Sequence, residues 1–251
     1  EIDCVIHLAA IVGDPLCKKI PIAAKQINED ATKKLAIISK KHGVKRFIFV
    51  SSVKVNGEMT KWNKPFNSDD DFVPDDPYGL SKYEAEQGLL ALAEETGMEV
   101  VIIRSPLVYG AGVGANFAYL IKWVNRGVPS PFGAIHNKRS LVALDNLVSF
   151  IVHCIDHPKA ANEVFLISDG EDVSTTELLQ EVAKAFGKRS LLIPVPVWLL
   201  TLAAKLIGKE DMANRLFSSL QVDSSKARDL LGWKPVITMD EQLKKIADAT
   251  K

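Results

Sequence analysis

A tyrosine and a lysine four residues apart, Tyr78 and Lys82, are the side chains of this sequence best suited to move a proton. Asp76 is a favoured helix cap and Pro77 a favoured first helical residue, so the sequence predicts that a helix begins there. Residues four apart share one face of a helix, which brings the phenol and the ammonium together. A free phenol titrates near ~10, and a neighbouring ammonium that lowers its pKa by about three units stabilises the phenolate by roughly 4 kcal/mol. The pair therefore suits acid–base chemistry near neutral pH.

The same spacing also fits an ordinary structural pair, so the surrounding elements decide what the pair can do. Short apolar runs alternate with amphipathic segments along the chain, which predicts a parallel sheet covered by helices and an α/β fold. Strands are expected over residues 3–8, 46–51, 99–104 and 163–168. Helices are expected over residues 24–42, 78–96, 116–126, 175–186, 197–207 and 239–249.

Composition indicates an ordinary globular protein that can bury a large core. The chain has 251 residues, 47% of them hydrophobic, and 31 basic residues balance 31 acidic ones. This balance, without a basic run, makes neither nucleic acid nor an anionic membrane an obvious partner. The most apolar stretch, residues 191–204, is too short to span a bilayer and is expected to pack in the core.

The three cysteines, Cys4, Cys17 and Cys154, share no metal-ligand spacing, and their odd number argues against a disulfide framework. We therefore expect no bound metal and a reducing, cytoplasmic environment.

Three predicted strands end in residues that could meet a ligand, because the crevice of an open parallel sheet lies beyond the carboxyl ends of its strands. Ser52 could reach a substrate oxygen there, or it could simply cap its strand. Leu8, Ala9 and Ala10 would let a flat ligand approach the backbone, although tight packing explains the alanines equally well. Pro106 lacks an amide donor and must end the third strand, so a loop facing the crevice is expected.

These pieces, in this order, resemble the extended short-chain dehydrogenase/reductases, the group of nucleotide-sugar epimerases and dehydratases. The resemblance covers nearly the whole chain, and Ala31 and Asn56 stand where the family usually has Gly and Tyr. It rests on His7-Leu8-Ala9-Ala10, Asn28-Glu29-Asp30-Ala31-Thr32, Val50-Ser51-Ser52-Val53-Lys54-Val55-Asn56-Gly57, and Tyr78 with Lys82.

The resemblance implies a role for each matching residue. Tyr78 would donate or accept the proton, and Lys82 would lower its pKa while binding the nicotinamide ribose of NAD or NADP. Ser52 would hydrogen-bond the reacting oxygen, and Asn28 would brace a neighbouring strand. Leu8, Ala9, Ala10 and Pro106 would also line the cofactor site.

The resemblance also implies the architecture. It suggests a Rossmann-type doubly wound sheet, residues 1–107 and 140–172, with a smaller mixed α/β substrate lobe, residues 108–139 and 173–251. The family's glycine-rich phosphate loop is absent from these residues, so we expect an N-terminally truncated chain. Residues 110–115 mimic that fingerprint, but they lack the flanking βαβ context.

A nucleotide-sugar substrate implies phosphate ligands, and guanidinium groups match phosphate oxygens. Arg139 and Arg215 resemble the family's two phosphate-binding arginines; surface salt bridges are the alternative for each. Asn116 and Lys54 would complete the substrate site of a UDP-sugar.

The residues after Ser52 bear on the reaction type. Val53 and Lys54 stand where 4,6-dehydratases carry an acidic pair, so dehydration is not expected. The sequence most resembles bacterial polysaccharide enzymes that reduce a 4-keto UDP-N-acetylamino sugar, with UDP-hexose 4-epimerase as the alternative. A non-catalytic dinucleotide sensor on the same fold is the alternative from another class. The resemblance further suggests a homodimer.

Overall fold

The core of the larger part of the molecule is a parallel sheet. We describe a computed structural model, which covers residues 2–70, 72–112 and 116–250. Its strands lie in the order β1 (Cys4–His7), β2 (Arg46–Ser52), β3 (Glu99–Ser105) and β6 (Glu163–Leu166), all parallel. Each coincides with a predicted strand to within two residues, and the Rossmann-type α/β fold is confirmed.

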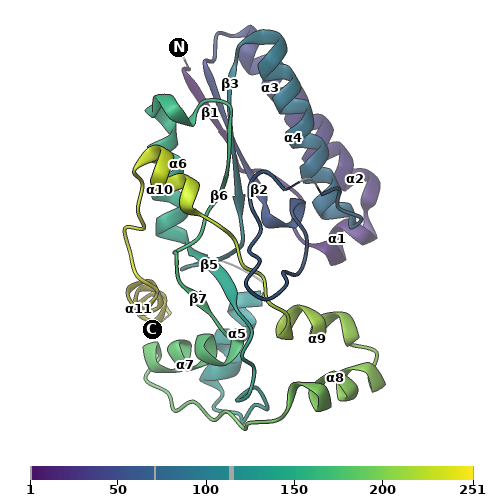
Figure 1. Cartoon of the computed structure of the whole chain (residues 1–251), viewed down its shortest axis with the longest axis vertical. Helices are drawn as coiled ribbons and strands as arrows, with labels where there is room; N and C mark the ends of the chain where they lie inside the picture. The colour runs from purple at the N-terminus through teal and green to yellow at the C-terminus, as the bar shows by residue number, and fades with distance from the viewer. Residues whose placement is uncertain (1, 71, 113–115, 251) are drawn as a thin grey trace.

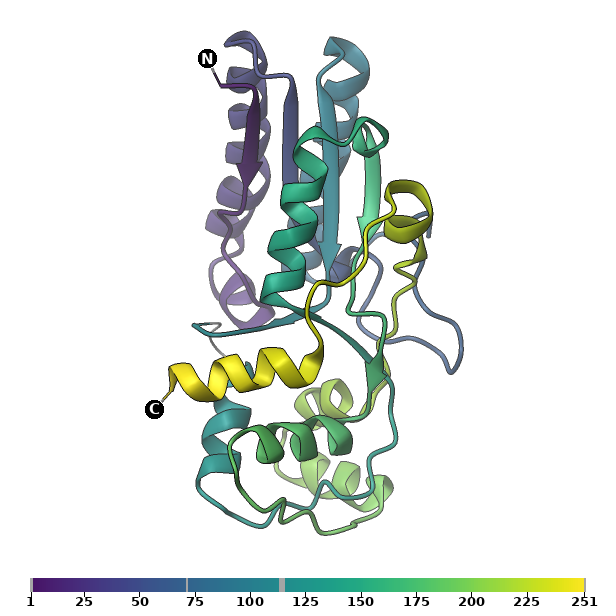
Figure 2. The same ribbon diagram turned by 90° about the vertical axis from the view of Figure 1, so that its left-hand side faces the viewer.

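Helices cover both faces of this sheet (Figure 1). Phe47 and Phe49 of β2 point to α3 (Ala31–Lys41) and α4 (Pro77–Thr96), whereas Ile48 between them packs with α6 (Leu144–Asp156) on the opposite face. Figure 2 shows α6 in front of the sheet. Because both faces are covered, the central residues of β2 and β3 are continuously apolar instead of alternating with polar residues.

The connection from β1 to β2 is less regular than the single helix expected over residues 24–42. It consists of α1 (Asp14–Lys19), α2 (Pro21–Lys25), a π-helical turn η1 (Gln26–Asp30) and then α3. The π turn contains Asn28, which is fully buried and hydrogen-bonds outside the helix. A π turn inside a helix often marks a functional site.

The loop expected after Pro106 is instead a strand. β3 does end at Ser105, but β4 (Leu107–Tyr109) follows at once and pairs with β5 (Arg139–Ala143), which also pairs with the short β7 (Asp172–Val173). The expectation was wrong because the partner of β4 lies far away in the sequence. The Tyr109 hydroxyl donates to Asp169 at 2.7 Å and ties β4 to the loop after β6.

Helices build the rest of the smaller part, at the lower end of Figure 1. They are α5 (Asn116–Asn125), α7 (Thr175–Ala185), α8 (Val197–Leu206), α9 (Glu210–Phe217) and α11 (Met239–Ala249). The remaining helix, α10 (Ser225–Leu231), instead lies beside α6 in Figure 1 and packs Ala227 and Leu231 into the core of the parallel sheet. The sequence did not predict α6, α9 or α10. α6 follows β5 directly and has no Gly or Pro between to mark its start. The short 3-10 turns η2 (Val53–Val55) and η3 (Pro158–Ala160) complete the elements. The predicted domain boundaries remain a prediction.

The expectation that residues 191–204 pack in the core is wrong. No residue of α8 is buried, and Trp198 is 69% exposed. The helix is mostly apolar, but only Val197, Leu200, Thr201 and Ala204 are half-buried, and the rest of its side chains are exposed. Within the described parts of the chain, no helix is both long and apolar enough to cross a membrane.

The start of α4 follows the sequence prediction. The Asp76 carboxylate accepts a hydrogen bond from the Gly79 amide at 2.8 Å, Pro77 is the first helical residue, and Gly97 ends the helix with φ 66°. Both ends of the helix are therefore determined by local sequence.

We expect Asp76→Ala to lower the free energy of unfolding by about 1–2 kcal/mol, because the buried helix start loses its cap. Asp76→Asn keeps an acceptor and should cost less. Urea unfolding of both variants tests this, with Asp75→Ala, at an exposed neighbouring position, as the control. Equal stability of Asp76→Ala and Asp75→Ala would contradict the capping role.

Candidate active site

Tyr78 and Lys82 lie one turn apart on the buried face of α4. Their helix starts directly against η2, the segment that follows Ser52. A Cβ atom at Gly79 would come within 3.0 Å of the Lys54 carbonyl oxygen and within 2.7 Å of the Asp76 carboxylate. Only glycine permits this approach, which brings the first turn of α4 to the end of β2.

Lys82 is the most constrained of the predicted catalytic residues. It is 2% exposed, its Nζ donates to the Val50 carbonyl at 3.0 Å, and the ammonium lies 4.5 Å from the centre of the Phe49 ring. Burial lowers the pKa of Lys82 to about 8, with Glu86 and then Cys17 opposing that shift. The ammonium is thus held at the end of β2 in a site that penalises its charge.

Tyr78 is buried at 8% exposure. Its side chain packs with Cys17 and Ala24 of the β1–β2 connection, and Ile11 packs against the same cluster. The cover over Tyr78 therefore comes from the irregular helical segment, not from the sheet.

Ser52 is the last residue of β2 and lies opposite Ser105, the last residue of β3. Its hydroxyl accepts a hydrogen bond from the Lys54 amide at 3.3 Å, so it also caps η2. The preceding Ser51 hydroxyl is buried and has no hydrogen-bond partner among the described residues. Two hydroxyls therefore lie at the strand end, one of them with an unused donor and acceptor.

Asn28 connects the loop after β1 to the start of α4. Its Oδ1 accepts from the Ile11 amide at 2.7 Å, and its Nδ2 donates to the Ile11 carbonyl at 2.9 Å and to the Ser81 hydroxyl at 3.0 Å. Ser81 in turn donates to the Tyr78 carbonyl at 2.8 Å. These hydrogen bonds brace the loop after β1 and the start of α4. Among the described residues none of the Asn28 side-chain bonds goes to a strand residue, so the bracing of a neighbouring strand remains a prediction.

The residues predicted to line the cofactor site follow the strand ends. Leu8 is 62% exposed beyond β1, and Ala9 beside it is also exposed. Ala10 is half-buried, and Pro106, just beyond β3, is buried. Their role in cofactor binding remains a prediction.

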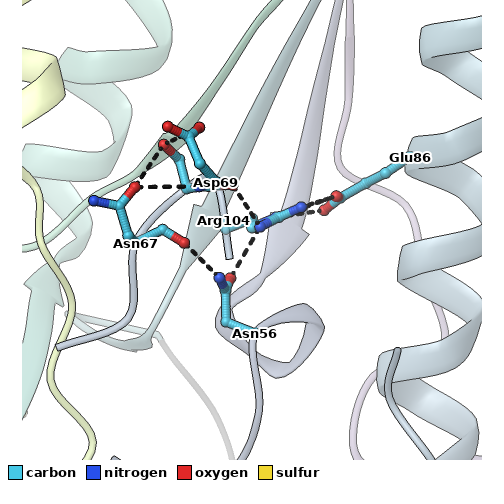
Figure 3. Close-up of polar contacts among 6 residues, drawn as sticks. Asn56, Asn67, Asp69, Glu86 and Arg104 are labelled. Carbon is cyan, nitrogen blue, oxygen red and sulfur yellow. Dashed lines mark hydrogen bonds and ion pairs between the residues drawn. The ribbon is translucent and has the colours of Figure 1, made fainter. Parts of the chain in front are cut away.

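A buried ion pair that the sequence analysis missed supports this edge of the sheet. Arg104 of β3 makes a bidentate contact with Glu86 of α4, Nη2 to Oε2 at 2.7 Å, and both residues are buried. The Arg104 Nη1 also donates to Asn56 Oδ1 at 3.1 Å and to the Ser68 carbonyl at 3.2 Å. Figure 3 shows the guanidinium between Glu86 and Asn56, which itself donates to the Asn67 carbonyl at 2.7 Å.

This network fixes the long loop between η2 and α4 to the sheet. Asn56, which replaces the Tyr expected there, connects the loop to Arg104. Glu86 lies one turn beyond Lys82, and Arg104 follows four apolar residues, Val100 to Ile103, near the end of β3. A charged residue at the end of a buried strand was the signal that could have revealed the pair.

The side chains predicted to bind the substrate, Lys54, Arg139 and Arg215, lie near one another at the end of α9. Lys54 pairs with Glu58, and Arg215 Nη2 lies 3.8 Å from the same carboxylate. Arg139 Nη1 donates to the carbonyls of Arg215 at 2.6 Å and of Ser218 at 3.2 Å, at the end of α9. Burial lowers the pKa of the Arg139 guanidinium.

The structure thus brings Lys54, Arg139 and Arg215 together from three distant segments. Asn116 is the first residue of α5, but its side chain lies outside the described part of the structure, as do residues 113–115 of the glycine-rich mimic.

Comparison with known proteins supplies the family. The model of the NAD dependent epimerase/dehydratase family matches residues 1–168. The chain belongs to the NAD-dependent epimerase/dehydratase family. The predicted family and the prediction of an NAD-dependent enzyme are confirmed.

Individual relatives agree with this family membership. The chain is 51% identical to a UDP-glucose 4-epimerase of Vibrio cholerae over 98% of its own length and 76% of that protein. A solved UDP-glucose 4-epimerase of Thermotoga maritima, in complex with UDP-glucose, superposes with a TM-score of 0.79 at 26% identity, covering 99% of this chain and 77% of that one. RMD of Pseudomonas aeruginosa, solved with NADPH, has a TM-score of 0.80 at 22% identity over 98% of this chain and 81% of that one, and shows the shared fold.

The residues of this family member fit a nicotinamide dinucleotide. The Lys82 ammonium has three donors, and among the described residues its hydrogen-bond acceptor is the Val50 carbonyl. The remaining donors suit ribose hydroxyls, and the unpaired Ser51 hydroxyl lies at the same strand end. Bound NAD would supply hydride exchange, while these side chains hold and orient it.

The lowered pKa of Lys82 predicts a pH-dependent stability. The pKa is about 8 in the folded chain and 10.5 in the unfolded one, so between these values the unfolded state holds a proton that the folded state lacks. The free energy of unfolding therefore rises with pH across this window. Below it, both states are protonated, and the buried charge costs roughly 3 kcal/mol.

We expect Lys82→Met to remove this rise. The difference between the free energies of unfolding of the wild type and the variant should therefore shift in favour of the wild type between about pH 8 and 10.5. Urea unfolding at a series of pH values measures the difference. Lys41→Met, at an exposed lysine, should leave the rise intact. Parallel curves for wild type and Lys82→Met would contradict the depressed pKa.

The buried ion pair gives a second prediction. Glu86→Gln leaves the Arg104 charge buried without its counter-charge and should lower the free energy of unfolding by about 3–5 kcal/mol. The double variant Glu86→Gln/Arg104→Met has no unpaired buried charge. Its free energy of unfolding should therefore fall by less than the sum of the decreases in the two single variants.

Urea unfolding of the four proteins in this double-mutant cycle measures the coupling. Glu181→Gln, which breaks a partly exposed pair with Lys184, should cost under about 1 kcal/mol. A similarly small decrease in the free energy of unfolding for Glu86→Gln would show that the Glu86–Arg104 pair does not fix the loop between η2 and α4.

Proposed function

We propose that this protein is an NAD-dependent UDP-hexose 4-epimerase that interconverts UDP-glucose and UDP-galactose. The observation that carries the proposal is the 51% identity to the Vibrio cholerae UDP-glucose 4-epimerase over 98% of the chain. The sequence alone favoured reduction of a 4-keto UDP-sugar, with epimerisation as the alternative. The relatives support action at C4 of a UDP-sugar and favour that alternative.

Tyr78 is proposed to remove the proton of the C4 hydroxyl and to return it after the keto sugar has turned. The phenol lies on a rigid helix whose first turn is capped and packed against η2. Lys82, one turn on, carries its charge below about pH 8 and would stabilise the phenolate through that charge. Ser52, at the end of β2, would donate to the reacting oxygen.

The surroundings of Ser52 argue against dehydration. Val53 is 5% exposed and packs in a small core with Leu166, Leu220 and Val222. A buried valine there offers no proton, and the next side chain, Lys54, is held by Glu58. The acidic pair that elimination needs is therefore missing from η2.

The diphosphate of the substrate is proposed to bind between Arg139 and Arg215. Both guanidiniums lie near the end of α9, and the Glu58 carboxylate currently balances Lys54 and Arg215. An incoming diphosphate would compete with Glu58 for these cations, because it offers more acceptor oxygens and more charge. Asn116 keeps its proposed place in the substrate site.

We propose that the protein acts in the cytoplasm and that it forms a homodimer. The dimer would form through α3 and α4, where Ile38 is 53% exposed, Ile37 42% and Leu80 36%.

The test gives the full-length protein UDP-glucose and follows UDP-galactose by chromatography, with no net change in reduced-cofactor absorbance. Tyr78→Phe should lower kcat by about 10²–10⁴-fold and leave NAD affinity nearly unchanged. Tyr83→Phe, on the same helix, is the control.

Oxidation of NAD(P)H by a 4-keto UDP-sugar, without epimerisation, would replace the proposal with the reductase function. NAD binding without either reaction would favour the non-catalytic sensor. Retained turnover in Tyr78→Phe would refute its acid–base role.

A further inference from the structure

The end of the smaller part farthest from the parallel sheet exposes an unusual amount of apolar surface. Leu206 is 80% exposed, and Trp198 and Ile207 are each 69% exposed. Other exposed apolar side chains of the same stretch are Leu191, Ile193, Leu199 and Leu202. Scattered apolar residues are normal on a surface, but a contiguous apolar helix marks an interaction site.

A second segment extends this surface. The amide of Ser130 donates to the Leu191 carbonyl at 2.9 Å, and the Ile193 amide donates to the Ser130 carbonyl at 2.8 Å. The segment that leads into Ser130 contains α5, where Tyr119 is 73% exposed and Trp123 46%. Residues 117–130 and 186–209 are thus joined through their backbones, and we call the exposed side chains of these two segments the α5–α8 surface.

The charge of this surface differs from that of the chain as a whole. The whole chain is neutral, yet residues 117–130 and 186–209 contain six basic residues and no acidic one. All of these basic side chains are exposed: Lys122, Arg126, Lys188, Arg189, Lys205 and Lys209. Acidic residues resume at Glu210 and Asp211, where α9 begins. The overall balance therefore hid a local excess of positive charge.

We propose that the α5–α8 surface docks the protein on an anionic lipid bilayer. Apolar side chains with Trp at their edge and flanking Lys and Arg are the composition of helices that lie in the membrane interface. The apolar groups enter the headgroup boundary, and the basic groups bind acidic lipids. No membrane-spanning helix is needed for such docking, and none exists among the described residues.

Charge disfavours a second copy of the chain as the occupant of this surface. A two-fold symmetric contact would place the same surface on both sides. The six basic residues of one copy would then face six of the other, and among the described ion pairs only Lys205 has an acidic partner, Glu210 at 3.9 Å. An anionic bilayer complements both the charge and the apolar character.

The position of this surface gives docking a consequence for the site. α8 leads directly into α9, which carries Arg215. The cations that converge at Glu58 therefore lie next to the docking surface, so that bilayer binding would bring them close to the lipid headgroups.

The test is co-sedimentation of the full-length protein with vesicles of phosphatidylcholine containing about one quarter phosphatidylglycerol, in about 0.1 M salt. We expect binding to these vesicles and several-fold weaker binding to pure phosphatidylcholine. Raising the salt to about 0.5 M should also release the protein. Because this readout is lipid binding, it is independent of the proposed epimerase activity.

Two variants separate the apolar from the basic contribution. Leu206→Ser/Ile207→Ser and Lys188→Gln/Arg189→Gln should each weaken binding at least about five-fold, since they remove exposed groups from the contact. Val148→Ser/Val152→Ser removes two valines of α6 that are 51% and 58% exposed, and it should bind like the wild type.

Absence of binding to the anionic vesicles would overturn the proposal. So would unchanged binding of Leu206→Ser/Ile207→Ser. A dimer in light scattering that this variant dissociates, without vesicle binding, would instead assign the surface to a second copy.

Discussion

The bidentate ion pair between Glu86 and Arg104 fixes the geometry on which the rest of the site depends. Glu86 is fully buried on α4, and Arg104 is the next-to-last residue of β3, so the pair locks the helix that carries Tyr78 and Lys82 to the sheet. The same guanidinium holds Asn56 and the Ser68 carbonyl, which fastens the loop after η2. Such a pair is costly to desolvate, and its geometry and additional hydrogen bonds offset that cost. Together with the Asp76 cap and the hydrogen bond of Lys82 to Val50, this buried contact positions Tyr78 and Lys82.

The buried charge of Lys82, unlike that of Arg104, has no carboxylate partner to offset its desolvation cost among the hydrogen bonds and ion pairs of the described residues. Its ammonium is buried over an aromatic ring with a backbone carbonyl as acceptor, and the site penalises its charge. A protein optimised for stability alone would place an apolar residue there. Strained or destabilised groups cluster where chemistry needs them. The capped start of α4 and the apolar core of the sheet let the fold tolerate this buried cation.

The smaller part of the molecule combines a structural and a binding role. β4 and β5 carry the chain from the parallel sheet into the helical end, and Arg139 of β5 braces the end of α9 through the carbonyls of Arg215 and Ser218. This brings the proposed diphosphate ligands together. Beyond them no residue of α8 is fully buried, so the proposed substrate-binding end of the protein and its apolar, basic surface are neighbours.

The sequence by itself determined the features that depend on local spacing. Apolar runs marked the four strands of the parallel sheet, Asp76, Pro77 and Gly97 marked the ends of α4, and the segments around Ser52, Tyr78 and Lys82 indicated the family. Only the tertiary structure decided the pairing of β4 with β5, the contact of Glu86 with Arg104, and the exposure of α8. Each of these depends on residues distant in sequence. An apolar segment is buried only if another element covers it, and periodicity reports the composition of a helix but not the presence of its neighbour.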